Sequence, residues 1–192
     1  MASLRWYIAT VNLLFQQYRR YTYAHVCYDK AMSKQTKYVV AVVLKNKSNP
    51  GEFLVVKRPD DDPDLGGHWG FPAATMQPGE LPEQAAKRIC REKLNCDGDV
   101  TRLLGIMFQK RNSYDIFLMD VDVVLADDQE PDVHAANTAH TAYVDQKWST
   151  DPEDLRGSAN GGSCCSSIFL TDRGLLDKDD WIASLEGSDT VG

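Results

Sequence analysis

Apolar runs separated by polar turns divide the first half of the chain into short elements. The run "KYVVAVVLKN" (37–46) is continuous and rich in valine, which predicts a buried strand. The turn sequence "KSNPGE" follows it, and "FLVVKRP" (53–59) then predicts a second strand that forms a hairpin with the first. After a polar loop, "HWGFPA" (68–73) predicts a short extended piece.

The periodicity changes from that of strands to that of a helix at "LPEQAAKRICREKL" (81–94). Pro82 fits the first turn of a helix, where its missing N–H leaves no hydrogen bond unmade. Asn95 and Gly98 are residues that commonly end a helix. The residues that follow the helical period, and that we expect on one face, are Ala85, Ala86, Ile89, Cys90 and Lys93.

Two long strands are predicted after this helix, at 100–112 and 114–127. Side chains alternate between the two faces of a strand, so Asp120 and Asp122 share one face of the second. The polar segment 128–143 predicts a long connection.

The C-terminal part of the chain predicts an extended piece and then a short helix within 146–159. Thr150 or Asp151 can cap this helix, and Pro152 fits its first turn. The segment "NGGSCCSS" (160–167) predicts a flexible loop, and the rest predicts a strand-like piece and a helix. Strands and helices in this irregular order predict an α/β fold with a mixed sheet between helices.

The N-terminal segment has a composition of its own, with no Asp, Glu or Lys before Tyr28. Its apolar residues recur at helical spacing; they are Leu4, Ile8, Val11, Phe15 and Tyr18. The segment is therefore a helix docked on the domain, an upstream extension of a chain that starts naturally at Met32, or an organelle transit peptide. We expect an extension at 1–31, one domain at 32–185 and a flexible tail at 186–192.

Composition narrows the class of protein. A chain of 192 residues is long enough for one domain with a core of its own. The formal net charge of −7 makes a nucleic-acid partner unlikely, and no apolar run is long enough to cross a membrane. Five cysteines without regular spacing favour a reducing compartment, the cytoplasm or alternatively the mitochondrion. The adjacent Cys164 and Cys165 are most simply two small, half-buried residues.

The stretch from Gly67 to Cys96 resembles the signature of the Nudix family, G-x5-E-x7-R-E-U-x-E-E-x-G-U, in which U is a bulky aliphatic residue. Anchored on "PGE" and "AAKR", the alignment puts Glu80 at the first glutamate, Arg88 at the arginine and Glu92 at the first residue of the Glu-Glu pair. In this register Ile89 and Lys93 stand where the family has carboxylates.

A second register stays open. It puts Arg91 and Glu92 at the Arg-Glu pair, Glu83 at the first glutamate and Gly98 at the last glycine. The alanines, which the first register places where small residues pack on the sheet, then fall out of place. The similarity beyond the signature extends over about 37–176, including Trp69 and the segment around Trp148.

The resemblance implies a Nudix fold and a hydrolase that cleaves a pyrophosphate bond in a small nucleoside diphosphate derivative. It implies Mg²⁺ or Mn²⁺ as cofactor, with Glu92 and Glu80 as metal ligands and with Arg88 completing the catalytic set. Substrate contacts are expected from Lys93, Arg58 and Trp69. The resemblance also allows a homodimer as the oligomeric state.

The departures from the signature leave simpler alternatives. In the simpler alternative, Glu92 is a solvated glutamate that pairs with Arg88. Lys93 is then a solvent-exposed lysine, which is the interpretation that we favour for this residue. Trp69 is otherwise a core residue, and the acidic run 60–64 a solvated turn. The whole chain is then a catalytically inactive Nudix-fold module that binds a partner or serves a structural role, as in the mitochondrial ribosome.

Overall fold

The computed structural model describes residues 35–111, 114–127, 129–136 and 143–177. All of them belong to a compact unit that begins at Gln35. The predicted extension at 1–31, the tail at 186–192 and most of the predicted C-terminal helix lie outside the described residues. The predicted domain boundaries therefore stay predictions.

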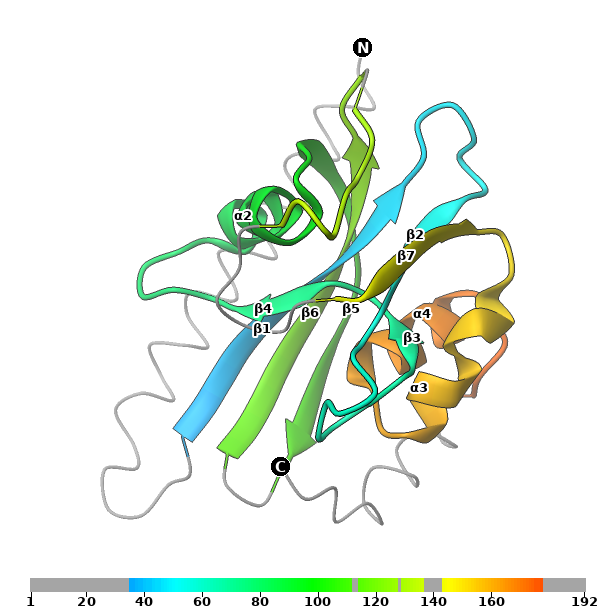
Figure 1. The fold of residues 1–192 in the computed structure, drawn as a ribbon. Helices are drawn as coiled ribbons and strands as arrows, with labels where there is room; N and C mark the ends of the chain where they lie inside the picture. The colour runs from blue at the N-terminus through cyan, green and yellow to red at the C-terminus, as the bar shows by residue number, and fades with distance from the viewer. Residues whose placement is uncertain (1–34, 112–113, 128, 137–142, 178–192) are drawn as a thin grey trace, which may run out of the picture. The chain divides into compact units, whose positions relative to one another are not determined.

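One mixed sheet organises the described residues (Figure 1). Its strands are β1 (Gln35–Lys45), β2 (Phe53–Lys57), β3 (Trp69–Gly70), β4 (Ala73–Thr75), β5 (Gly98–Lys110), β6 (Tyr114–Leu125) and β7 (Asp145–Ser149). The main path is β3-β2-β1-β6-β5, with β4 on β1 and β7 on β2. Strands β1 and β6 are parallel, and the other pairs are antiparallel.

The predicted hairpin of β1 and β2 is confirmed at its closed end. Lys45 pairs with Phe53 there, and beyond that pair the two strands separate. β4 then pairs with Val39, Val40 and Ala41 of β1, while β2 pairs with β7 and β3. The short segment that precedes α2 is in this way part of the sheet.

The helices cover both faces of the sheet. They are α2 (Pro82–Leu94), α3 (Arg156–Asn160) and α4 (Cys164–Asp172), with a short 3-10 helix, η1 (Pro152–Leu155), before α3. α2 packs against β1, β4, β5 and β6, and α4 packs against β5 and β6. Figure 1 shows α2 on one side of the sheet and α3 and α4 on the other, as the sequence predicted.

The pattern of buried residues explains why 82–94 forms a helix on the sheet. Ala85, Ala86, Ile89 and Cys90 are fully buried, and they recur at the spacing of one helical face. The helix ends at Asn95, whose φ of 50° lies in the left-handed region. An asparagine tolerates this conformation better than most residues, although glycine fits it best.

We expect Asn95→Ala to lower the free energy of unfolding by about 1 kcal/mol, because a Cβ without a compensating polar group is strained at this φ. Asn95→Gly should leave the stability unchanged or raise it. Urea unfolding of the two variants and the natural protein measures both effects. An alanine variant as stable as the natural protein would contradict the left-handed helix end.

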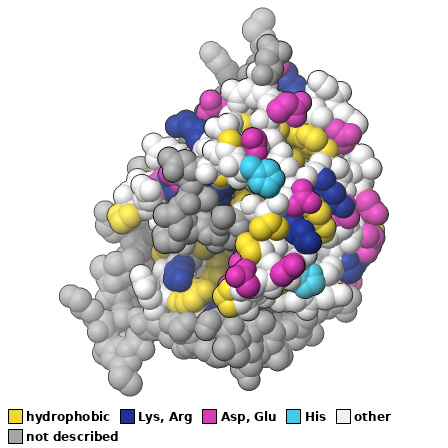
Figure 2. All heavy atoms as spheres, in the orientation of Figure 1, with side chains coloured by type: hydrophobic (Ala, Val, Ile, Leu, Met, Phe, Trp, Pro, Cys, Tyr) yellow, Lys and Arg dark blue, Asp and Glu magenta, His cyan; other side chains and the backbone are white. Residues whose placement is uncertain are grey.

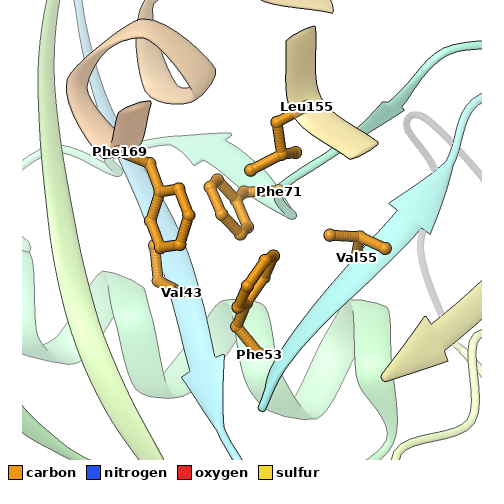
Figure 3. Packing of buried hydrophobic residues seen from close by; sticks show 6 residues of the cluster. All are labelled: Val43, Phe53, Val55, Phe71, Leu155 and Phe169. Carbon is orange, nitrogen blue, oxygen red and sulfur yellow. The ribbon is translucent and has the colours of Figure 1, made fainter. Parts of the chain in front are cut away.

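A cluster of aromatic residues fills the space between the sheet and α4 (Figure 3). The rings of Phe53 and Phe169 lie 4.7 Å apart, and those of Phe71 and Phe169 lie 5.1 Å apart. Val43, Val55 and Leu155 complete the cluster. It fixes α4 and η1 on the face of the sheet opposite α2.

The prediction of a flexible loop at 160–167, followed by a strand-like piece, is wrong. α4 begins at Cys164, where the Ser163 hydroxyl accepts a hydrogen bond of 3.4 Å from the Ser166 backbone N–H. The hydroxyls of Ser158 and Ser166 lie 2.7 Å apart and are buried. These small polar residues satisfy one another inside the protein, so a composition typical of loops forms a buried helix. Cys164 and Cys165 are both free thiols; Cys165 is half-buried, as predicted, whereas Cys164 is buried.

The exposed surface carries both signs of charge. Figure 2 shows acidic and basic side chains intermixed on one face of the described residues. Two surface ion pairs, Lys87 with Asp99 and Arg91 with Asp97, illustrate the mixture. Among the described helices, none has both the length and the apolar composition that a membrane span requires.

Candidate functional site

Arg88 joins the loop before α2 to the helix itself. Its Nε donates to Oε1 of Glu80 at 2.7 Å and its Nη2 donates to Oε2 at 2.8 Å. Nη2 also donates to the carbonyl of Thr75 at 3.0 Å, and the backbone N–H of Gln77 donates to Glu80 at 2.8 Å. We call these four residues the Arg88 clamp. The hydrogen bonds from Arg88 lower the pKa of Glu80 against the opposing effect of burial.

Glu92 lies one turn further along α2. Its Oε2 accepts a hydrogen bond of 3.1 Å from Nη1 of Arg88. Its side chain is 44% exposed, whereas that of Glu80 is 10% exposed. Arg88 therefore pairs with Glu92, as one alternative predicted, and also with the loop, and Glu92 is the carboxylate that meets solvent.

Lys93 is buried, with 5% of its surface exposed, so the expectation of a solvent-exposed lysine is wrong. Its Nζ lies 5.2 Å from the centre of the Tyr143 ring. Burial lowers the pKa of Lys93 to about 8, and the positive charges of Arg58 and Arg88 act in the same direction. The helical period predicted the burial, since Lys93 follows Ala86, Ile89 and Cys90 on one face.

Arg58 reaches the same region from the end of β2. Its Nη1 donates to both carboxylate oxygens of Asp62, at 3.1 and 3.0 Å. Asp62 also accepts from the backbone N–H groups of Asp64 and Leu65. The prediction of a solvated acidic turn is thus wrong for Asp62, which shapes the loop and holds Arg58.

Trp69 belongs to the core region and to a polar network of β7. Its ring packs against the aromatic cluster, and Nζ of Lys147 lies 4.8 Å from the ring centre. Lys147 in turn pairs with Asp154 at 2.7 Å. These contacts account for the position of Trp69 without a ligand, and its role in substrate binding stays a prediction.

Tyr143 was not among the site residues expected from the sequence. This residue is buried, and its hydroxyl accepts a hydrogen bond of 3.3 Å from the backbone N–H of Ala73. Burial raises its pKa to about 12. A signal was available, because Tyr143 is the one tyrosine in an otherwise small and polar connection, 128–143.

The geometry favours the first register of the signature. Ala85 and Ala86 are fully buried, which matches the small residues that this register places against the sheet. In this register Ile89 replaces a glutamate of the signature, and its side chain is fully buried. A carboxylate at that position would lie in the apolar interior, where an ionised group is strongly disfavoured.

The described residues do not fit the magnesium or manganese site that the resemblance implies. Both oxygens of Glu80 bind Arg88, and Glu92 shares the same guanidinium. Mg²⁺ requires several oxygen ligands. Lys93, the residue after Glu92, supplies a positive charge where the signature has a second carboxylate ligand. Within the described ranges, no three His, Cys, Asp or Glu side chains lie close enough to hold a metal ion. Asp122 of β6 adds no ligand, since it binds Arg102, which also binds Asp172 of α4.

Solved structures with the same fold share little sequence with this chain. The MutT protein of Methanosarcina mazei Go1 superimposes with a TM-score of 0.55 and 13% identity, over 75% of this chain and 97% of its own. The ORF135 protein of E. coli gives 0.55 and 23%, over 76% and 96%. A NUDIX hydrolase from Nitrosomonas europaea gives 0.50 and 15%, over 79% and 87%. At these identities the likeness shows the fold alone.

The sequence comparisons identify the family. No curated protein sequence matches the chain. The family model described as the NUDIX domain matches residues 35–156, a segment that runs from the start of β1 to the first residue of α3 and contains the Arg88 clamp and Lys93. Because this match covers more than half of the chain, the protein belongs to the Nudix family.

Proposed function

We propose that this Nudix protein binds a nucleoside diphosphate derivative near the C-terminal half of α2 and cleaves its pyrophosphate bond. The observation that carries the proposal is the exposed carboxylate of Glu92, held at 3.1 Å by Arg88. Arg88 is fixed in turn by Glu80 and by the Thr75 carbonyl. A catalytic group needs this kind of support, because its position must be set before the substrate arrives.

In the proposed reaction Glu92 acts as the general base. Its carboxylate takes one proton from a water molecule, and the water oxygen forms a bond to one phosphorus of the pyrophosphate. The bond from that phosphorus to the bridging oxygen breaks. The products are a nucleoside monophosphate and a second phosphate ester, and the remaining water proton stays on the phosphate that was attacked. No step passes through a divalent cation, because the described residues do not fit one.

A second candidate is binding without cleavage. Arg88 bonds to both Glu80 and Glu92, so the carboxylate that would act as the base is already held by a guanidinium. In this case the same face of α2 recognises the ligand, and Glu92 serves only to hold Arg88. Both candidates require nucleotide binding, and they differ in whether a product forms.

The test compares the natural protein with Glu92→Gln. With ADP-ribose as the probe, we expect AMP and ribose 5-phosphate as products, and we expect the substitution to lower the rate about a hundredfold. Calorimetry should show that Glu92→Gln still binds ADP-ribose, since the amide keeps the shape of the side chain.

Glu83→Gln is the matched control, because Glu83 lies on the same helix, is 59% exposed and pairs with Lys87 rather than with the Arg88 clamp. It should cleave at the natural rate. ADP-ribose that binds to the natural protein and is never cleaved would establish the binding module. If neither ADP-ribose nor a panel of other nucleoside diphosphate derivatives binds, with or without Mg²⁺ and Mn²⁺, both candidates fail.

A further inference from the structure

Two exposed apolar side chains lie close together on β5. Ile106 is 48% exposed and Phe108 is 50% exposed, and they share one face of the strand because side chains alternate along it. Met107, between them, is buried in a cluster with Ile168 of α4. Ile106 and Phe108 therefore face the opposite side of the sheet, which is the side that carries α2.

Two aromatic residues extend this surface across the neighbouring strands. Phe108 pairs with Phe117 of β6, and Phe117 pairs with Tyr38 of β1. Residues that pair directly in neighbouring strands project to the same face. The rings of Tyr38 and Phe117 lie 5.8 Å apart, and both residues are half-buried. We call Tyr38, Ile106, Phe108 and Phe117 the aromatic platform, which spans three strands over a width of about 10 Å.

The helix on this side of the sheet, α2, lies over the other end of the strands. Lys87 of α2 pairs with Asp99, near the start of β5, whereas the platform lies toward the end of that strand. Figure 1 shows β1, β5 and β6 continuing past α2. The platform is close to the point where the chain enters the sheet, since Gln35 at the start of β1 pairs with Tyr114 at the start of β6. An exposed apolar surface of this kind marks a contact site.

The segment that runs into β1 has the sequence to cover the platform. Residues 1–34 lie outside the described residues and join β1 at the platform's end of the sheet. Their apolar residues at helical spacing are Leu4, Ile8, Val11, Phe15 and Tyr18. A helix over 4–18 would be about 22 Å long, which is enough to cross the three strands. A helix this short gains most of its stability by packing its apolar face against another surface.

Charge favours this segment as the occupant. It has no acid before Tyr28 and carries Arg5, Arg19 and Arg20, whereas the whole chain has a formal net charge of −7. Asp115 of β6 lies on the platform's face, two residues before Phe117, and its Oδ1 is buried without a hydrogen-bond partner among the described residues. A basic segment can supply donors to this carboxylate. A second copy of the chain would instead bring one acidic domain against another.

We propose that residues 1–31 dock on the aromatic platform as an amphipathic helix, with their apolar face against Ile106 and Phe108. This inference is independent of the proposed function. Of the alternatives for the N-terminal segment, it selects the helix docked on the domain.

The experiment measures cleavage of the full chain by trypsin after Arg19 and Arg20, with mass spectrometry to identify the fragments. We expect these cuts to be at least about tenfold slower than in a synthetic peptide of residues 1–31, because cleavage requires the undocked segment. Phe108→Ser should accelerate them at least about fivefold, since it removes apolar contact area from the platform. Phe15→Ser in the segment should do the same. Combining the two should add little, because both remove one contact.

Leu175→Ser is the matched control, because Leu175 is 41% exposed but follows α4, on the other side of the sheet. It should leave both cuts at the natural rate, and cuts within 35–177 should stay slow in every variant that is folded. The inference is wrong if trypsin cuts the natural protein as fast as the peptide, or if Phe108→Ser changes nothing. Protection that rises with protein concentration, together with a dimer in sedimentation velocity, would also overturn it, since a second copy would then cover the platform.

Discussion

Replacing Arg88 by methionine should lower the free energy of unfolding by about 3 kcal/mol. The substitution removes two hydrogen bonds to Glu80, one to Glu92 and one to the carbonyl of Thr75. Glu80 would keep the backbone N–H of Gln77 as its partner, and its side chain is only 10% exposed. A poorly hydrated carboxylate without its cation is the main cause of the expected loss.

The stability of the variants is to be measured by urea unfolding at constant pH. Arg91→Met is the matched control, because Arg91 lies on the same helix and its pair with Asp97 is exposed at both ends, by 63% and 56%. Such a surface pair contributes about 0.5 kcal/mol. Adding Glu80→Gln to Arg88→Met should recover part of the loss, since it removes the unpaired charge. A loss of less than about 1 kcal/mol for Arg88→Met would show that the clamp does not hold the loop.

Arg88→Met also tests whether the Arg88 clamp supports catalysis by Glu92. Arg88→Met leaves Glu92 in the chain but removes the group that positions it. We therefore expect cleavage of ADP-ribose to fall together with stability.

The sequence predicted the helices and strands correctly wherever the spacing of the apolar residues matches the side chains that are buried. β1, β2, β5, β6 and α2 lie within a few residues of their predicted ranges. In each, the apolar positions face a neighbouring layer, so the period of the sequence reports the structure directly. The Nudix signature could be recognised for the same reason, since its spacing follows the turns of α2.

The prediction of α4 failed because buried polar groups satisfy one another. Ser158 and Ser166 lie eight residues apart in the sequence, and their contact depends on how α3 and α4 pack together. Composition alone cannot distinguish serines that bond to each other from serines that face water. The same holds for Asp62, whose partners Arg58, Asp64 and Leu65 come together only when the loop closes.

The sequence predicted which residues belong to the candidate site, but it did not predict which partners each of them contacts. Glu80, Arg88, Glu92 and Lys93 were all expected near one another from helical spacing. Their partners decide what they do. Glu80 is committed to Arg88 rather than to a metal, and Lys93 is buried against Tyr143, a residue 50 positions away in the sequence.

Asp120 of β6 is a buried acid in an apolar setting. It is fully buried, and neither carboxylate oxygen has a hydrogen-bond partner among the described residues. It pairs through the backbone with Ala41 and Gly105, on the face of the sheet covered by Ile168 of α4. Burial, and then the charge of nearby Asp122, raise the pKa of Asp120 well above its ordinary value of 3.8. Asp120 is consequently protonated in the folded protein at pH values where the unfolded chain has lost that proton.

This difference makes stability depend on pH in a defined direction. Above pH 3.8, up to the raised pKa of Asp120, the folded protein binds one proton more than the unfolded chain. The free energy of unfolding therefore falls as the pH rises through this window, by up to about 1.4 kcal/mol for each pH unit from this group alone. Below the window both states are protonated, and the contribution disappears.

Asp120→Asn should abolish this dependence, because the amide has nearly the same shape and stays neutral at every pH. The variant should equal the natural protein near pH 4 and exceed it by a margin that grows by up to about 1.4 kcal/mol for each pH unit. Urea unfolding at a series of pH values measures the margin. Asp99→Asn, the same substitution at a side chain that is 85% exposed, is the control. A constant difference for Asp120→Asn would mean that Asp120 is ionised in the folded protein, which requires a cation or water beside it.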